Sequence, residues 1–109
     1  MTVQELVKRT NFEPILLSDP MREVKGGYAG DLLSWVMGRA KEGDCWVTIM
    51  SNVNVAAVAQ LADVACVVFA EGVRPDETLL NAAKTHRVNL LLTREDVFST
   101  CCKVAEVLQ

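Results

Sequence analysis

The chain has 109 residues, which is the usual size of one domain and leaves no room for a second core of similar size. Half of the residues are hydrophobic but only 6% are aromatic, so we expect a core of aliphatic side chains. The 14 acidic and 11 basic residues give a net charge of -3, and the basic ones are scattered, which argues against nucleic acid as a partner. We therefore predict one domain over residues 1–109, with residues 1–10 as an N-terminal helical arm.

The N-terminus has no basic start, continuous apolar segment or small-residue cleavage site of the kind that secretory signals contain. No apolar run approaches the roughly 20 residues that a membrane span needs, so a cytoplasmic protein without a membrane partner is expected. The cysteines form no CxxC pair and no Cys/His pattern with metal-ligand spacing, so we predict reduced structural thiols and no metal site. These are Cys45, Cys66, Cys101 and Cys102.

The first elements along the chain are short. Thr2 and Glu5 fit a capping box, in which each side chain binds the other residue's free amide, and predict a helix through about Arg9. A strand is expected over Ile15 to Leu17, followed by a turn. A second short strand is expected over Val24 to Tyr28, ending in glycines.

From Asp31 the apolar residues follow a helical period, which predicts a helix that ends near Gly43. They are Leu32, Leu33, Trp35, Val36, Met37 and Ala40. On a helical wheel they span roughly 200°, whereas one core contact needs a stripe of about 100°. We therefore expect this helix to bury two faces, the second against the N-terminal arm or against a second copy of the chain.

The rest of the chain alternates between strand and helix. The predicted order is a strand over Cys45 to Met50, a helix over Asn54 to Ala62, a strand over Val64 to Ala70, a helix over Asp76 to His86, a strand over Val88 to Leu92 and a helix over Glu95 to Leu108. The strand segments are almost continuously apolar, as in parallel sheets that helices cover on both faces. Right-handed crossovers then give an α/β three-layer sandwich with a mainly parallel sheet.

Ligands of open parallel sheets bind beyond the carboxyl ends of the strands, where helix N-termini present free amides. The loops that follow the three apolar strands carry polar side chains suited to a phosphorylated or nucleotide-like small ligand. These candidate ligand-binding residues are Ser51, Asn52, Asn54, Arg74, Thr93 and Arg94. The competing interpretation is that the serine, asparagine and threonine residues are ordinary helix N-caps.

A glycine-rich segment formed by Gly26, Gly27 and Gly30 leads into Asp31 and the predicted helix. Its glycines would let the backbone approach a ligand or another chain closely, so all four residues join the candidate ligand-binding set. The segment matches neither the P-loop nor the dinucleotide-binding pattern. Asp31, at a helix start, is more often a cap than a base.

No residue set has the pattern of a catalytic centre. His86 is the only histidine, and at a predicted helix end it complements the helix dipole. The GxSxG pattern of hydrolases is missing, and Cys101 and Cys102 point about 100° apart on a helix. We therefore predict no catalytic residue, no cofactor and no enzymatic activity.

The segment GGYAGDLLSWVMGRA and the strands and helices after it resemble the DRTGG domain family over about residues 10 to 108, and most resemble its stand-alone bacterial members. The resemblance rests on the helix start at Gly30 to Ser34, the strand from Cys45, the strand from Val64 with its Gly72 and Pro75 turn, and the Thr93, Asp96 and Phe98 pattern. The string D-R-T-G-G is missing from this sequence, so a ligand site tied to that string is not carried over.

Members of that family are appended to phosphotransacetylases and to CBS-domain pyrophosphatases, and their fold is similar to the N-terminal domain of HPr kinase/phosphorylase. The resemblance implies a regulatory or dimerising module, with a nucleotide-like ligand as an alternative. It implies no kinase activity, because the P-loop of that kinase lies in a separate domain.

The leading hypothesis is a non-catalytic module that forms a homodimer through Tyr28, Leu32, Trp35 and Met37, since aromatic and methionine side chains are enriched at interfaces. A place for Trp35 in the chain's own core is the other interpretation. The second hypothesis is a sensor domain for the small ligand described above. A third is an enzyme whose second chain completes a site at the glycine-rich segment.

Overall fold

The computed structural model describes all residues, 1–109, and contains one five-stranded sheet in the order β1-β5-β4-β3-β2. The strands are β1 (Glu13–Leu16), β2 (Gly26–Ala29), β3 (Asp44–Thr48), β4 (Cys66–Phe69) and β5 (Leu90–Leu92). β2, β3, β4 and β5 pair in parallel, while β1 pairs with β5 in the antiparallel direction. The predicted mainly parallel sheet is therefore confirmed.

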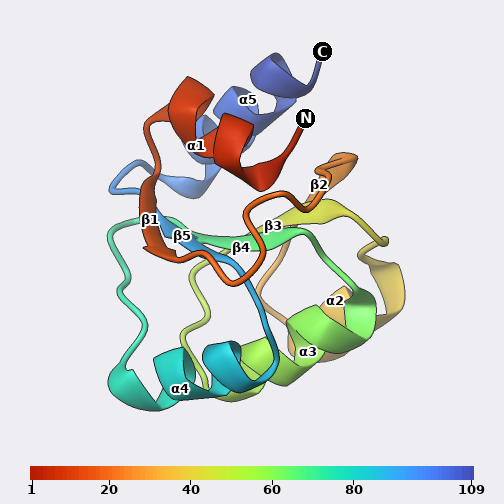
Figure 1. Cartoon of the computed structure of the whole chain (residues 1–109), viewed down its shortest axis with the longest axis vertical. Helices are drawn as coiled ribbons and strands as arrows, with labels where there is room; N and C mark the ends of the chain where they lie inside the picture. Colours follow the sequence, from red (N-terminus) through yellow and green to blue (C-terminus); the bar gives the residue numbers. More distant parts are fainter.

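Helices cover both faces of the sheet (Figure 1). The helices are α1 (Val3–Thr10), α2 (Leu33–Arg39), α3 (Asn54–Ala62), α4 (Glu77–Thr85) and α5 (Val97–Leu108). α1 and α5 lie together on one face, and α2, α3 and α4 lie on the other. This arrangement is the predicted α/β three-layer sandwich. None of the helices has the length and apolarity that a membrane span requires.

The continuous apolar strands build two core layers because successive side chains point to opposite faces of a sheet. Trp46 and Val67 pack with α2, α3 and α4, whereas Cys45 and Val68 pack with α1 and α5. All five residues of β3 and all four of β4 are buried. Such burial explains why these strands show no alternation of polar and apolar residues.

Several helix starts agree with the sequence. The capping box is present, with the Glu5 amide donating to Thr2 Oγ1 at 3.2 Å and the Thr2 amide donating to Glu5 Oε1 at 3.0 Å. Asp76 and Asp96 cap α4 and α5 in the same way, through the amides three residues on. The pKa values of Glu5 and Asp96 are lowered because these hydrogen bonds favour the charged carboxylates.

Two expectations for the helix after Asp31 were wrong, namely its end near Gly43 and the N-terminal arm as the cover of its second face. α2 ends at Arg39 rather than near Gly43 and buries only Val36. The N-terminal helix α1 packs beside α5 on the opposite face of the sheet, so it does not cover α2. The apolar side chains outside the core flank therefore stay exposed: Leu32 by 56%, Trp35 by 52% and Met37 by 46%. Trp35 does not fill the chain's own core.

The second short strand, predicted over Val24 to Tyr28, is present as β2 but covers Gly26–Ala29, so Gly26 and Gly27 lie inside the strand and pair with the first residues of β3. A Cβ atom at Gly26 would lie 3.0 Å from the Asp44 carboxylate, which is tighter than ordinary contact. Glycine at position 26 therefore lets two backbones approach at the start of the strands.

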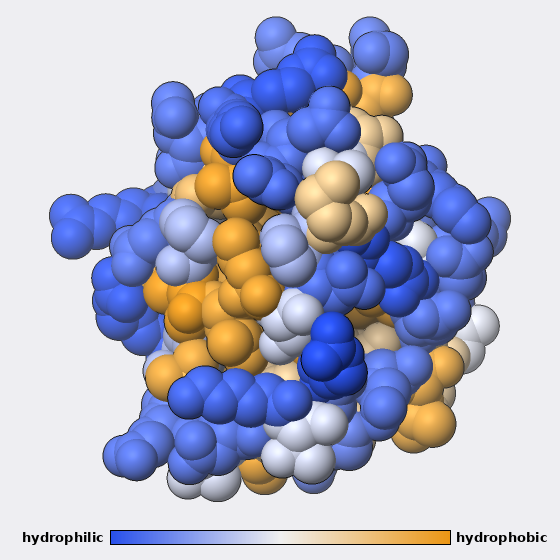
Figure 2. All heavy atoms as spheres, viewed as in Figure 1, coloured by the Kyte–Doolittle hydropathy of each residue, from blue (hydrophilic) through white to orange (hydrophobic).

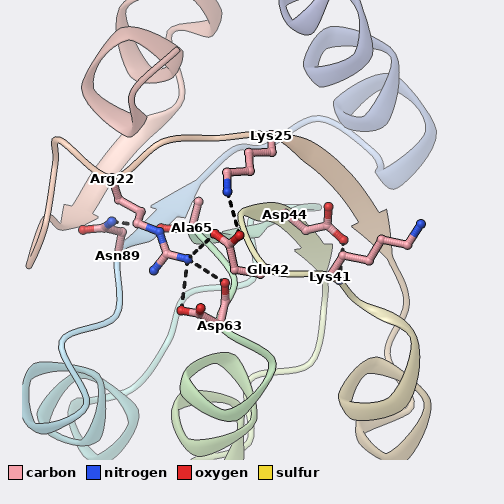
Figure 3. A network of polar contacts seen from close by, with 8 residues as sticks. All are labelled: Arg22, Lys25, Lys41, Glu42, Asp44, Asp63, Ala65 and Asn89. Atoms are coloured by element: carbon pink, nitrogen blue, oxygen red, sulfur yellow. Dashed lines mark hydrogen bonds and ion pairs between the residues drawn. The ribbon is translucent and has the colours of Figure 1, made fainter.

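The segment of residues 18–25 crosses the amino ends of the parallel strands, on its way from one edge of the sheet to the other (Figure 3). Asn89 fixes its start: its side chain accepts from the Asp19 amide at 2.8 Å and donates to the carbonyls of Asp19 and Ala65 at 2.8 and 2.9 Å. Asn89 is buried, so these bonds fully satisfy an amide in the interior.

Ion pairs fix the rest of this segment (Figure 3). Arg22 lies 3.1 Å from Glu42 and 3.0 Å from Asp63, and Lys25 lies 2.6 Å from Glu42. The hydrogen bonds from Lys25 and Arg22 lower the pKa of Glu42. The amino ends of the strands are thus closed by side chains that bind one another.

Candidate functional site

The carboxyl ends of the parallel strands hold most of the sequence-predicted ligand residues. Gly30 and Asp31 follow β2, while Ser51, Asn52 and Asn54 follow β3. Arg74 follows β4, and Thr93 and Arg94 follow β5. The structure therefore brings eight of the ten residues to one end of the sheet. Gly26 and Gly27 lie at the opposite end, beside Asp44 and Cys45.

Asp31 connects the ends of β2 and β3 and is not a helix cap. Its Oδ1 atom accepts a hydrogen bond from Thr48 Oγ1 at 2.8 Å and from the Ile49 amide at 2.9 Å. The N-cap of α2 is Leu32, which makes no side-chain capping bond. The prediction that Asp31 caps the helix was wrong because the carboxylate satisfies the end of the neighbouring strand instead.

The loop after β3 supports the structural interpretation of its asparagine. Asn52 Oδ1 accepts from the Asn54 amide at 2.8 Å, which is an Asx-turn at the start of α3. Asn52 and Asn54 are exposed and Ser51 is half-buried. Ile49 and Val53 in this loop are exposed apolar residues, by 41% and 40%.

The loops after β4 and β5 leave the sheet toward opposite faces, one to α4 and the other to α5 (Figure 1). Such a divergence opens a ligand crevice in many α/β proteins. Here backbone hydrogen bonds join the two loops, from Gly72 to the Thr93 carbonyl at 2.9 Å and from Glu71 to the Glu95 carbonyl at 2.8 Å. The crevice is therefore closed, and the chain has no pocket on its surface.

The two arginines at this end differ in their surroundings. Arg74 donates to both carboxylate oxygens of Glu13 at 3.0 Å, which turns it toward β1 and away from the other candidate residues. Arg94 is exposed and lies near Gly72, whose added Cβ atom would be 3.9 Å from its side chain. Arg94 is thus the cation at this end that remains available to an anion.

The cysteines are free thiols, as predicted. Cys45 and Cys66 are opposite one another in β3 and β4 and are fully buried. The hydrogen bond with Cys66, together with burial, raises the pKa of the Cys45 thiol, and burial raises the pKa of Cys101. Raised pKa values keep thiols protonated, so Cys45 and Cys101 are poor nucleophiles.

The fold is similar to part of a solved regulatory protein. The sequence matches no protein-family model and none of the curated proteins. Among solved structures, it is similar to the regulatory region, with CBS and DRTGG domains, of a Clostridium perfringens pyrophosphatase in complex with the activator diadenosine tetraphosphate. The TM-score is 0.74 at 14% sequence identity, over 99% of this chain and 46% of that one. This chain has a DRTGG-like fold. The similarity therefore confirms the fold that the sequence resemblance implied.

The predicted interface residues lie at the outer side of this DRTGG-like fold. Tyr28 is half-buried in the edge strand β2, and the side chains of α2 described above are exposed. Sequence reasoning missed Arg39, whose guanidinium carbon lies 3.7 Å from the centroid of the Trp35 ring. The spacing of four residues on one helix was the available signal, because it places both side chains on the same face.

Figure 2 shows a second hydrophobic area, on the side of the viewed face where β1 runs. The half-buried side chains of this part of the chain are Ile15, Leu16 and Leu17. They pack against the two core layers, so this area is the outer margin of the core.

Proposed function

We propose that residues 1–109 act as one non-catalytic regulatory module, which works by associating with a second copy of itself. The observation that carries this proposal is the fold, because almost the whole chain superposes on a regulatory region. Exposed Trp35, Leu32 and Met37 support self-association, since a large apolar residue in water favours burial against a partner. Free thiols support a reducing compartment such as the cytoplasm.

Sedimentation equilibrium over a range of protein concentrations tests this function. We expect a reversible dimer whose share increases with concentration. A chain that remains monomeric at the highest soluble concentration contradicts the proposal. Measurement at low and high salt separates the apolar and the ionic contributions to dimer stability, because apolar burial persists in salt while exposed ion pairs weaken.

The alternative function is a sensor for a nucleotide-like or phosphorylated ligand. It is supported by the complex of the pyrophosphatase regulatory region with diadenosine tetraphosphate. In this chain the ligand would bind at the carboxyl ends of the strands, with Arg94 as its cationic contact. Because a single chain has no pocket there, the ligand would lie on an open surface or between two copies.

Thermal denaturation with diadenosine tetraphosphate, ATP and inorganic phosphate tests this alternative. A ligand present at about 100 times its dissociation constant stabilises the folded state by about 2.7 kcal/mol. Arg94→Ala should remove the stabilisation, whereas Arg87→Ala should keep it. Arg87 is the matched control because it is exposed at the amino ends of the strands, where it donates to the Ser18 carbonyl. The absence of any shift with all three compounds contradicts the sensor.

A further inference from the structure

The two outer strands of the sheet differ in the protection of their free edges. An unprotected edge pairs with other strands, and proteins prevent this with proline, charged side chains and bulges. β1 has all three features: it contains Pro14, its Glu13 is ion-paired with Arg74, and its pairing shifts register before Leu16. β2 has the sequence Gly-Gly-Tyr-Ala and contains none of them.

The backbone of β2 presents hydrogen-bonding groups at its free edge. At the end of the strand the Gly30 amide donates to the Val47 carbonyl at 3.2 Å, on the β3 side. Because the amides of a strand alternate in direction, those of Gly26 and Tyr28 also face β3, whereas those of Gly27 and Ala29 point away from it. The residues on either side of Tyr28 are Gly27 and Ala29, which are exposed and too small to keep another strand away.

One flank of α2 continues this edge. The flank that packs in the core contains Leu33, Val36 and Ala40. Leu32, Trp35 and Arg39 lie on the neighbouring flank, as their spacing of three and four residues requires. The crossover from β2 through α2 to β3 is right-handed in this class of fold, so that flank faces away from α3 and toward the free side of β2 (Figure 1). Tryptophan and arginine are the residues that most often dominate binding energy at interfaces.

We propose that two copies of the chain pair along the free edges of β2, antiparallel about a two-fold axis at Tyr28, so that one sheet continues through both copies. This inference rests on the proposed function of self-association and identifies the surface used. The stacked Trp35 and Arg39 of each copy then lie next to the new strand pair.

The charged residues on either side of β2 are compatible with antiparallel pairing about an axis at Tyr28. Lys25 precedes Tyr28 by three residues and Asp31 follows it by three. Lys25 binds Glu42 of its own chain at 2.6 Å, but its side chain is 58% exposed, and a two-fold axis at Tyr28 places it opposite the partner's Asp31, where opposite charges across a strand pair are favourable. Thr48 and Ile49 both bind Oδ1 of Asp31, which leaves Oδ2 for the partner's lysine.

A disulfide cross-link tests the axis directly. The variant Tyr28→Cys is made in a chain that carries Cys101→Ser and Cys102→Ser. The outward amides of Gly27 and Ala29 form the bonds across the axis, so the two Tyr28 residues are a non-hydrogen-bonded pair with Cα atoms about 4.5 Å apart, within the range of about 4.4–6.8 Å that disulfides span. We expect mild oxidation to give a covalent dimer that a reductant separates. Phe98→Cys in the same chain is the control, since Phe98 is 78% exposed on α5, and it should give no dimer.

The variant Trp35→Lys tests the flank of α2. We expect its dimer dissociation constant to increase by about tenfold or more, while Phe98→Lys leaves the constant unchanged. Circular dichroism verifies that both variants fold. A dimer that persists in Trp35→Lys and does not cross-link through Tyr28→Cys overturns the β2 interface but leaves the proposed function intact. A chain that is monomeric at every concentration overturns both and leaves the β2 edge to a strand of another protein.

Discussion

The amino and carboxyl ends of the parallel strands are built differently. At the amino ends, Asn89 and Arg22 bind the 18–25 segment to the starts of the strands, and Glu42 neutralises two cations. At the carboxyl ends, Asp31 and Arg74 have partners, but Arg94 is exposed. The difference shows which polar residues maintain the fold and which remain available to a partner or ligand.

The largest loss of stability is expected when Asn89 is replaced. Asn89→Ala leaves the buried Ala65 carbonyl and the part-buried Asp19 amide without their partner, so the free energy of unfolding should fall by about 3 kcal/mol. The matched variant at the carboxyl ends is Asn52→Ala, which loses one exposed bond to the Asn54 amide and should cost about 0.5–1 kcal/mol. Urea denaturation measures both. Equal losses would contradict the difference between the ends.

Asp31 is expected to be the exception among the residues of the carboxyl ends. Asp31→Ala removes the acceptor of the buried Thr48 hydroxyl and of the Ile49 amide, which should lower the free energy of unfolding by about 1–2 kcal/mol. Asp31→Asn keeps an oxygen acceptor and should lose less than Asp31→Ala. If both variants are as stable as the unmodified chain, Asp31 is free for another function.

A smaller loss of stability is expected from Arg22→Met, for which Arg94→Met is the comparison. Arg22→Met removes the ion pairs with Glu42 and Asp63 and should destabilise the chain by about 1 kcal/mol. Arg94→Met should change the free energy of unfolding by no more than about 0.5 kcal/mol. Urea midpoints that reverse this order would show that Arg94 has a structural role.

The smallest expected effect is a loss of stability at acidic pH that depends on Glu42. The pKa of Glu42 is lowered by its hydrogen bonds with Lys25 and Arg22. A carboxylate with a lowered pKa in the folded state stabilises the fold above its unfolded pKa of about 4, and this stabilisation is lost as the pH falls through the folded pKa. The urea midpoint should therefore decrease from about pH 6 to about pH 3, and decrease less in Glu42→Gln. An identical decrease in both chains would exclude Glu42 as a contributor.

Local signals in the sequence predicted the framework of the fold. The apolar strands and the capping box at Thr2 depend on neighbouring residues only, and all are present. The convergence of the loops after β2 to β5 followed from the parallel order of the strands. A resemblance over short motifs was enough to predict the DRTGG-like fold that the structural similarity confirms.

The features that could not be predicted from the sequence depend on contacts between residues far apart in the chain. Aspartate just before a helix usually caps it, but the Asp31 carboxylate accepts from the Ile49 amide at the end of β3 and makes no bond to the start of α2. Gly26 and Gly27 were included in the candidate ligand-binding set because glycine is rare in strands, whereas the contact of Gly26 with the Asp44 side chain is visible only in three dimensions. The pairing of Arg74 with Glu13 joins residues that are far apart in the chain.

The central claim is that this module associates through the free edge of β2, while the contacts at the amino ends of the strands stabilise the fold. Amide hydrogen exchange at low and high protein concentration tests this claim most directly. The Ala29 amide points away from β3, so we predict slow exchange at high concentration and fast exchange on dilution, with Val67 unchanged at both. Exchange at Ala29 that is independent of concentration, in a sample that contains dimer, would contradict the account.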